Sequence, residues 1–174
     1  MNDLRLPPGQ LTQGLSVGGP MDKAIAGFAA AVVRIRDVDP LLRELVRLRC
    51  AQIHDCRLCG SLRFDEALEA GFDEDMQRKI ARYESSDFSP PVKVALRLCD
   101  AIIMTPSLAD DNLRADLQQH FSDSQITSLC LDVMKWSQQK VLVALRMEAP
   151  PWETTTTLSF DAEGNPAFGK PAYS

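Results

Sequence analysis

Residues 43–71 read RELVRLRCAQIHDCRLCGSLRFDEALEAG and hold a CxxC motif made by Cys56 and Cys59. Such a motif serves both disulfide exchange and zinc binding, so its setting decides between them. At helical spacing the two Cα atoms lie about 5 to 6 Å apart, which is within the range that a disulfide needs. A position in the first turn of a helix also favours the thiolate, because the potential there is positive. The motif therefore predicts thiol chemistry if it opens a helix.

Hydrophobic spacing predicts helices on both sides of the motif. Asp39 and Pro40 have the form of an N-cap and a first helical position, and the helix that they open continues to about His54. The segment Cys56–Ala70 is predicted to be one helix, which Gly71 ends. The charged residues of the preceding helix, Arg43, Glu44 and Arg47, are expected on its polar face.

The whole chain is predicted to be an all-α domain of six or seven helices. Residues 1–20 are an expected extended arm, residues 21–149 the helical domain, and residues 150–174 an extended tail with a small hairpin. The last helix is apolar nearly all round, so it is expected at the centre or in a subunit interface. Besides the two helices described above, the pattern predicts helices over 21–37, 73–83, 94–106, 110–119 and 122–147, the last opened by a capping box at Ser122 and Gln125.

The stretch from Arg43 to Gly71, together with Phe121–Asp123, resembles the AhpD-like and carboxymuconolactone decarboxylase family. In that family a helical glutamate precedes the first cysteine by twelve positions, as Glu44 precedes Cys56. The resemblance implies an AhpD-like helical bundle in which Cys59 attacks a peroxide and becomes a sulfenic acid. Cys56 would resolve it to a disulfide, and Glu44 would serve in a proton relay.

One position departs from the family pattern. Arg63 stands four residues after Cys59, where the peroxidase members carry a histidine. On one helix the two would share a face, so the guanidinium would favour the thiolate; it cannot shuttle protons at neutral pH. His54, two residues before Cys56, is a candidate for the missing titratable group, and a surface histidine at a helix end is the alternative.

Plainer interpretations stay open for each residue. The CxxC could be two small buried side chains, and Glu44 could pair with Arg43 or Arg47 on a solvated helix face. Arg63 could pair with Glu66. A zinc site is a further alternative, although four ligands from one short stretch would strain tetrahedral geometry. Its ligands would be Cys50, His54, Cys56 and Cys59, whereas Cys50, Cys99 and Cys130 otherwise read as core residues and His120 has no assigned role.

Composition limits the partners. The 174 residues carry a net charge of −5 with a pI near 5.0, so nucleic acid and anionic membranes are poor candidates. The sequence lacks an apolar stretch typical of a secretory signal or a membrane span, and five cysteines suit a reducing compartment, so a cytoplasmic location is expected.

The predicted function is that of a thiol-dependent oxidoreductase that reduces a peroxide or a disulfide, with no cofactor and no metal. The resemblance implies an external dithiol as reductant, such as a lipoyl or thioredoxin-like protein, and a homo-oligomer, a trimer or hexamer. Two alternatives are a carboxymuconolactone decarboxylase-type lyase and a non-enzymatic redox sensor.

Overall fold

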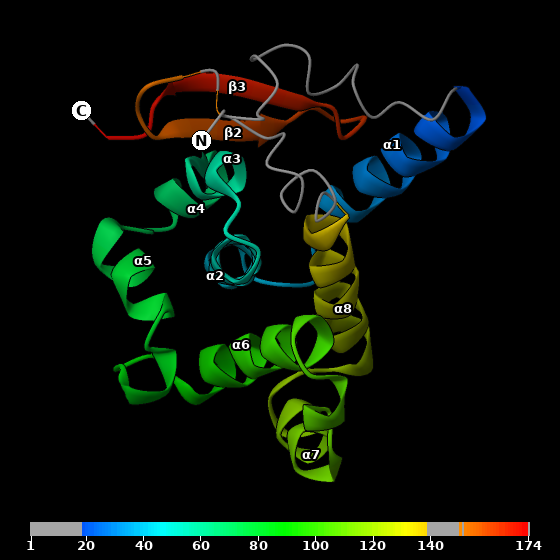
Figure 1. Ribbon diagram of the computed structural model, residues 1–174, viewed down its shortest axis with the longest axis vertical. Helices are drawn as coiled ribbons and strands as arrows, with labels where there is room; N and C mark the ends of the chain where they lie inside the picture. Colours follow the sequence, from blue (N-terminus) through cyan, green and yellow to red (C-terminus); the bar gives the residue numbers. More distant parts are fainter. Residues whose placement is uncertain (1–18, 139–149, 151, 174) are drawn as a thin grey trace, which may run out of the picture.

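A computed structural model describes residues 19–138, 150 and 152–173 (Figure 1). Over these residues the chain forms eight α-helices, two short 3-10 helices and one three-stranded sheet. The elements are α1 (Gly19–Val33), α2 (Pro40–Ile53), α3 (Arg57–Gly60), β1 (Leu62–Phe64), α4 (Asp65–Glu69), α5 (Glu74–Ile80), η1 (Tyr83–Ser85), α6 (Pro90–Ile103), η2 (Pro106–Leu108), α7 (Asp111–His120), α8 (Asp123–Ser137), β2 (Thr156–Phe160) and β3 (Pro166–Pro171).

Helix α2 is the centre of the fold. It is seen end-on in Figure 1 and packs against α6 and α8 and, on another side, against α3, α4 and α5. The predicted start is confirmed, because the Asp39 carboxylate accepts hydrogen bonds from the backbone N–H groups of Leu41 and Leu42. Every side chain from Leu42 to Leu48 is buried. The prediction of a solvated polar face is therefore wrong, since neighbouring elements enclose the helix.

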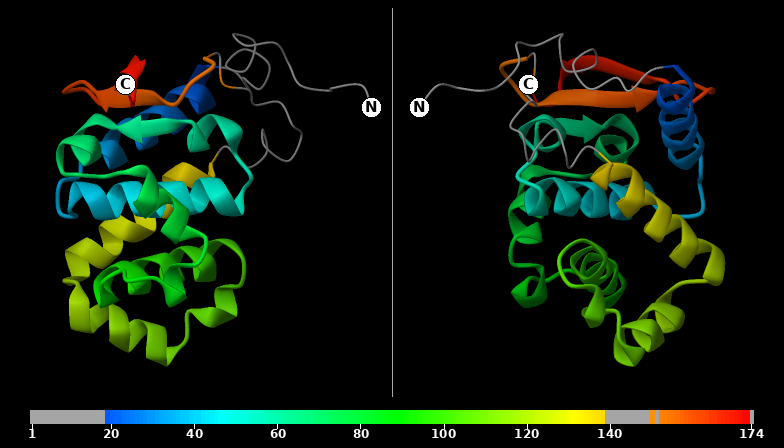
Figure 2. Two further views of the ribbon diagram at one scale, coloured as in Figure 1. Left: turned by 90° about the vertical axis from the view of Figure 1, so that its left-hand side faces the viewer. Right: turned by 45° about the vertical axis from the view of Figure 1, so that its right-hand side comes forward.

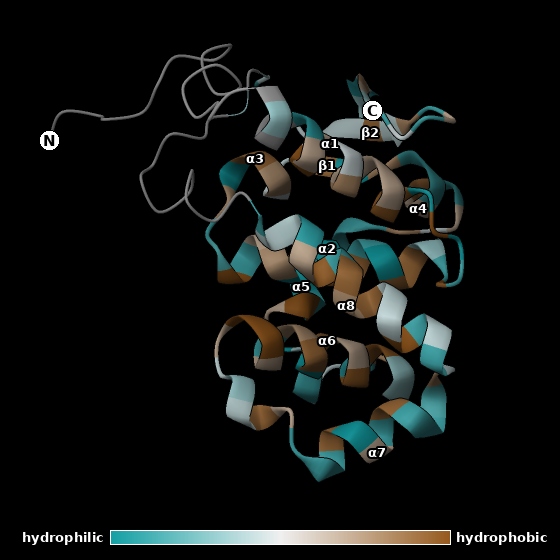
Figure 3. Cartoon of the chain, turned by 90° about the vertical axis from the view of Figure 1, so that its right-hand side faces the viewer, coloured by the Kyte–Doolittle hydropathy of each residue, from teal (hydrophilic) through white to brown (hydrophobic). Residues whose placement is uncertain are grey.

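The main hydrophobic core lies between α2, α6, α7 and α8. Hydrophobic residues recur along α6 and α8 in Figure 3, whereas α7 at the bottom is largely hydrophilic. Burial of these apolar side chains supplies the main driving force for folding. The most buried members of this core are Val46, Cys50, Cys99, Ala101, Leu129 and Val133.

The segment predicted as one helix, Cys56–Ala70, is instead a helix, a strand and a second helix. Strand β1 interrupts it and pairs in parallel with β2, so that Leu62 lies opposite Thr156. The backbone N–H of Thr156 donates to the carbonyl of Ser61 at 2.9 Å. Strand formation here depends on a partner about ninety positions away in the chain, so local hydrophobic spacing could not predict it.

The predicted hairpin in the tail is present as β2 and β3. It lies across the helices at the top of the molecule in Figure 2, with its turn against α1. There the Arg34 guanidinium donates to the carbonyl of Glu163 at 2.9 Å. At Gly164 a side chain would meet the carbonyl oxygen of Ala30 at 2.5 Å, so only glycine allows this approach. The tail therefore covers the helical layer instead of projecting from it.

Several local predictions are confirmed. The capping box of Ser122 and Gln125 is present, Asp73 caps α5, and Gly71 takes a positive φ of 95° after α4. Helix α1 ends at Val33, a few residues before the predicted end at Asp37. The predicted arm lies almost entirely outside the described residues, as does the predicted end of the last helix. None of the helices within the described ranges is both long and apolar enough to cross a bilayer.

A tight turn connects the end of α2 to the CxxC motif. Asp55 has a φ of +53°, the left-handed conformation that glycine usually adopts at this place. The N–H of Asp55 donates to the carbonyl of Gln52, and the N–H of Cys56 donates to the carbonyl of Ala51 at 2.9 Å. These two bonds form a Schellman motif, which ends α2 and reverses the chain directly before Cys56.

Replacement of Asp55 tests this turn. We expect Asp55→Gly to leave the free energy of unfolding unchanged or to raise it by up to about 1 kcal/mol, because glycine adopts a positive φ without steric cost. A β-branched residue cannot do so easily, and Asp55→Val should lower the free energy of unfolding by about 1 to 2 kcal/mol. Urea unfolding at pH 7 measures both, and equal stability of the two variants would contradict the assignment.

Candidate active site

The two cysteines of the motif lie on one short turn. Cys56 is the N-cap of α3, and its Sγ accepts a hydrogen bond from the N–H of Cys59 at 3.3 Å. Both side chains are 6% exposed, and all five cysteines of the chain are thiols without disulfides. Helix α3 has only four residues, so a thiolate at Cys56 would be stabilised by this N–H and not by a long helix dipole.

A fully buried ion pair lies directly behind the turn. The Arg47 guanidinium makes a bidentate contact with the Glu44 carboxylate, with both N···O distances at 2.7 Å. Both side chains are inaccessible to solvent. The expected pairing of Glu44 with Arg47 thus exists, but in the interior and not on a solvated face. Burial acts to lower the pKa of Arg47, and the contact with Glu44 outweighs this effect and raises it.

The same guanidinium holds the CxxC turn in place. Arg47 donates to the carbonyl of Cys59 at 2.6 Å and to the carbonyl of Leu62 at 2.5 Å. Glu44 also accepts a bond from the N–H of Phe64 at 3.4 Å. The ion pair therefore connects α2 to both α3 and β1, and Glu44 acts on the cysteines through Arg47. A proton relay through Glu44 stays a prediction.

Lys135 is a residue of this site that the sequence analysis missed. Its side chain is 8% exposed, and its ammonium lies 2.8 Å from the ring centre of Trp136 and 5.7 Å from that of Phe160. Burial lowers the pKa of Lys135 to about 7, and Cys59 is the largest of the influences that raise it. The available signal was a lysine within a helix predicted to be apolar nearly all round.

Cys59 and Lys135 open into one cavity of about 250 Å³. Its floor is formed by α3 and α8, one side by α1, and its cover by the β2–β3 hairpin. The wall is mostly apolar and aromatic, so it can bind an apolar ligand next to the Cys59 thiol. Its larger apolar side chains are Leu58, Leu62, Trp136, Leu158, Phe160 and Phe168.

Cys56 lines a second cavity, which has a volume of about 180 Å³. The side chains of Gln52, Asp55 and Gln77 also line this cavity. The two cysteines of the motif thus line different cavities.

Arg63 does not occupy the predicted helical position. It lies in β1 between Leu62 and Phe64, so its side chain points to the opposite sheet face from theirs. The guanidinium donates to the carbonyl of Gly60 at 2.8 Å and to the carboxylate of Glu74 at 3.1 Å. The argument from a shared helix face with Cys59 is therefore wrong, and the partner is Glu74 instead of Glu66.

His54 lies at the C-terminal end of α2, where its Nε2 is 2.9 Å from the hydroxyl of Ser137. It remains a candidate proton-transfer group. The zinc alternative fails, because Cys50 belongs to the core and contacts Cys99 there. Across residues 19–138, 150 and 152–173 no group of three or more His, Cys, Asp or Glu side chains is placed to hold a metal ion.

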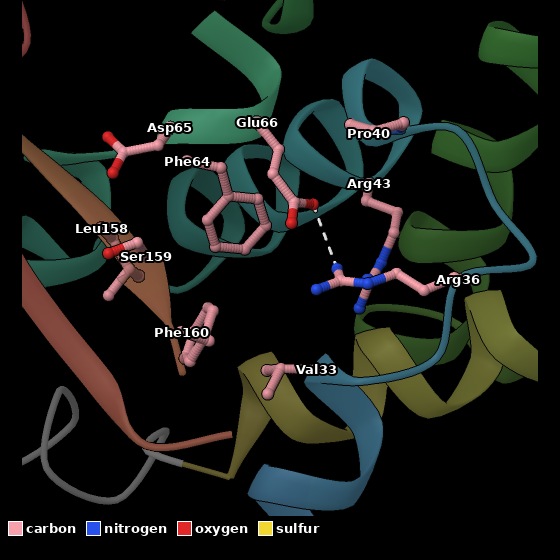
Figure 4. A pocket seen from close by; sticks show the side chains of 10 residues that line it. All are labelled: Val33, Arg36, Pro40, Arg43, Phe64, Asp65, Glu66, Leu158, Ser159 and Phe160. Carbon is pink, nitrogen blue, oxygen red and sulfur yellow. Dashed lines mark hydrogen bonds and ion pairs between the residues drawn. The ribbon is translucent and has the colours of Figure 1, made fainter. Parts of the chain in front are cut away.

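A third cavity, of about 60 Å³, lies beyond Phe160 (Figure 4). Its rim carries Arg36, which donates to the Glu66 carboxylate at 3.0 Å, and Phe64 points into it. None of its lining residues is a cysteine, histidine or lysine. It lacks a nucleophilic thiol, so the candidate active site is the cavity of Cys59 and Lys135.

Comparison with solved structures identifies the architecture. The crystal structure of ATU0492 from Agrobacterium tumefaciens, described as a protein of unknown function and a candidate antioxidant defence protein AhpD, matches with a TM-score of 0.65. The match covers 77% of this chain and 92% of that one, at 20% sequence identity. The fold is AhpD-like. No family model matches the sequence.

Curated relatives are more similar in sequence. The uncharacterized protein Rv2313c of Mycobacterium tuberculosis is 38% identical over 145 residues, which cover 82% of this chain and 51% of the relative. The uncharacterized protein YnjA of Escherichia coli is 32% identical over 93 residues, 53% of this chain and 51% of YnjA. This AhpD-like chain thus spans about half the length of Rv2313c.

The ion pair behind the candidate active site gives a stability prediction. Glu44→Gln should lower the free energy of unfolding by about 3 kcal/mol or more, because the buried Arg47 charge loses its counter-charge. Chemical denaturation at pH 7 measures the change. Glu66→Gln is the matched control, since the Arg36–Glu66 pair is more than half exposed on both sides, and its effect should stay within about 0.5 kcal/mol. Equal effects of the two substitutions would contradict the assigned role.

Proposed function

We propose that the chain is a thiol-dependent oxidoreductase that reduces organic hydroperoxides through Cys59 and Cys56 and is recycled by an external dithiol. The observation that carries the proposal is the position of Cys59. Cys59 lines a mostly apolar cavity, and Cys56 lies on the same turn. A peroxide bound in this cavity would meet the Cys59 thiol among apolar side chains.

The proposed chemistry has two steps on the protein. The thiolate of Cys59 attacks the outer oxygen of the hydroperoxide, the O–O bond breaks, and Cys59 becomes a sulfenic acid while an alcohol leaves. Cys56 then attacks the sulfenic sulfur, a disulfide forms, and water leaves. Cys56 and Cys59 are both thiols that are not at disulfide distance in this structure, so the turn must rearrange for this bond to form.

The external dithiol is proposed to attack at Cys56. The separate cavity beside Cys56 would give access to the disulfide from a side that the substrate does not occupy. A lipoyl group or a thioredoxin-like protein has the required paired thiols, and two electrons from it would restore both cysteines. Glu44 and Arg47 position the turn throughout, and Arg63 anchors it through the carbonyl of Gly60.

Turnover with purified protein tests the proposal. With cumene hydroperoxide as substrate and dihydrolipoamide or reduced thioredoxin as reductant, we expect steady consumption of hydroperoxide. Cys59→Ser and Cys56→Ser should each lower the rate at least about 100-fold, because either change removes a reacting atom. Cys130→Ser is the matched control and should retain the rate, since Cys130 is partly buried on α8 against the core and lines neither the Cys56 nor the Cys59 cavity.

Two results would contradict the proposal. If Cys59→Ser retains turnover, the thiol of the cavity is not the nucleophile. If peroxide forms the disulfide once and neither dithiol reduces it, the redox-sensor alternative is favoured over an enzyme.

A further inference from the structure

The AhpD-like site lacks a histidine at position 63, and the cavity holds a different titratable group. We infer that Lys135 is the proton-transfer partner of Cys59, which takes the proton of the thiol and gives it to the alkoxide released from an organic hydroperoxide. This inference rests on the proposed function. It adds a catalytic residue from α8, 76 positions beyond Cys59.

The first argument is position. Lys135 and Cys59 line the same cavity from opposite elements, α8 and α3, and the ammonium is held against the rings of Trp136 and Phe160. Aromatic faces attract a cation without accepting its proton. Within the part of the chain that the structure describes, no carboxylate pairs with Lys135, so its proton is not committed to an ion pair.

The second argument is the balance of buried charge. Among the described residues, the interior behind the cavity holds two complete ion pairs, Glu44 with Arg47 and Arg43 with Asp132. Protonated Lys135 therefore adds one positive charge that these pairs do not neutralise. A thiolate at Cys59 supplies the matching negative charge, and a charge in a dry interior strongly favours such a partner.

The third argument is the pKa of Lys135, which lies near neutral pH. Burial lowers the pKa of Lys135 to about 7. The charges of Arg47 and Arg43 also lower this pKa, whereas Cys59 and Asp132 raise it. A group with this pKa can accept and return a proton near neutral pH, as an efficient general acid and base must. Arg63 cannot, because a guanidinium stays protonated.

The proton and electron balance closes at this site. The neutral amine of Lys135 accepts the Cys59 thiol proton, so an ammonium faces a thiolate. The thiolate attacks the outer oxygen of the hydroperoxide and takes up that OH group, and the O–O bond breaks. The inner oxygen leaves as an alkoxide, takes the proton from the ammonium and departs as an alcohol. Cys59 is oxidised by two electrons and the hydroperoxide is reduced by two.

The test separates charge from proton transfer with two substitutions. Lys135→Met removes both, whereas Lys135→Arg keeps a charge that does not titrate at neutral pH. Two quantities are measured for Cys59 by mass spectrometry of its peptide: the rate of alkylation by iodoacetamide against pH, and the rate of oxidation by cumene hydroperoxide in a single turnover. Lys93→Met, on the outer part of α6, is the matched control.

We expect Lys135→Met to move the midpoint of Cys59 alkylation upward by about one pH unit or more. Lys135→Arg should keep the wild-type midpoint and still lose at least about tenfold in the rate of oxidation by hydroperoxide, because no proton reaches the alkoxide. Lys93→Met should change neither. An unchanged midpoint in Lys135→Met, or full oxidation rates in both Lys135 variants, would overturn the inference.

Loss of the fold is checked separately. The pKa of Lys135 is lowered in the folded protein, so below pH 7 the buried ammonium destabilises the fold, and this cost declines as the pH rises above 7. Lys135→Met should therefore unfold at the same or a higher urea concentration than the wild type at pH 6. If wild-type Cys59 reacts with no hydroperoxide while its alkylation midpoint still depends on Lys135, the proposed function fails and the pairing of Lys135 with Cys59 stands.

Discussion

The position of the CxxC turn depends on one interaction, the buried ion pair of Glu44 and Arg47. Burying two charges costs several kcal/mol per ion, and the cost is offset only if the remaining hydrogen-bonding groups are satisfied. Here they are, because the guanidinium bonds to both carboxylate oxygens and to two backbone carbonyls. Those carbonyls belong to Cys59, which bears the thiol, and to Leu62, the first residue of β1. The hydrogen bonds that stabilise the buried Arg47 charge therefore also fix the positions of Cys59 and of the start of β1.

The cavity in front of the turn is assembled from distant parts of the chain. Helix α1, the CxxC turn, the end of α8 and the C-terminal hairpin each supply one side. The hairpin is held by its parallel pairing with β1 and by the close approach of Gly164 to α1. Because β1 is in turn fixed by Arg47, the ion pair supports both Cys59 and the cover of the cavity that Cys59 lines.

Local signals in the sequence were sufficient for three helix boundaries. Asp39 with Pro40, Gly71, and Ser122 with Gln125 each act through hydrogen bonds to residues within a few positions. The CxxC pair and Glu44 were also identified as a unit, and the structure connects them through Arg47. Asp55 was missed as a helix end, because aspartate takes the left-handed conformation less often than glycine does.

Long-range effects could not be predicted in this way. Strand β1 forms because β2 lies beside it, and this pairing turns Arg63 to the opposite face of the sheet from Leu62. The burial of Arg47 and Lys135 likewise depends on which elements cover α2 and α8. A lysine in an apolar helix signals an unusual environment, but only the packed structure shows that its neighbour is a cysteine of the motif.

The central claim is that Cys59 is the thiol that reacts first and Cys56 the thiol that resolves it. Trapping with dimedone, which labels sulfenic acids, tests this most directly when one equivalent of cumene hydroperoxide is added to Cys56→Ser and to Cys59→Ser and the labelled peptide is identified by mass spectrometry. The account predicts a dimedone adduct on Cys59 in the first variant and no adduct on Cys56 in the second. An adduct on Cys56 in Cys59→Ser, with Cys59 unlabelled in Cys56→Ser, would contradict it.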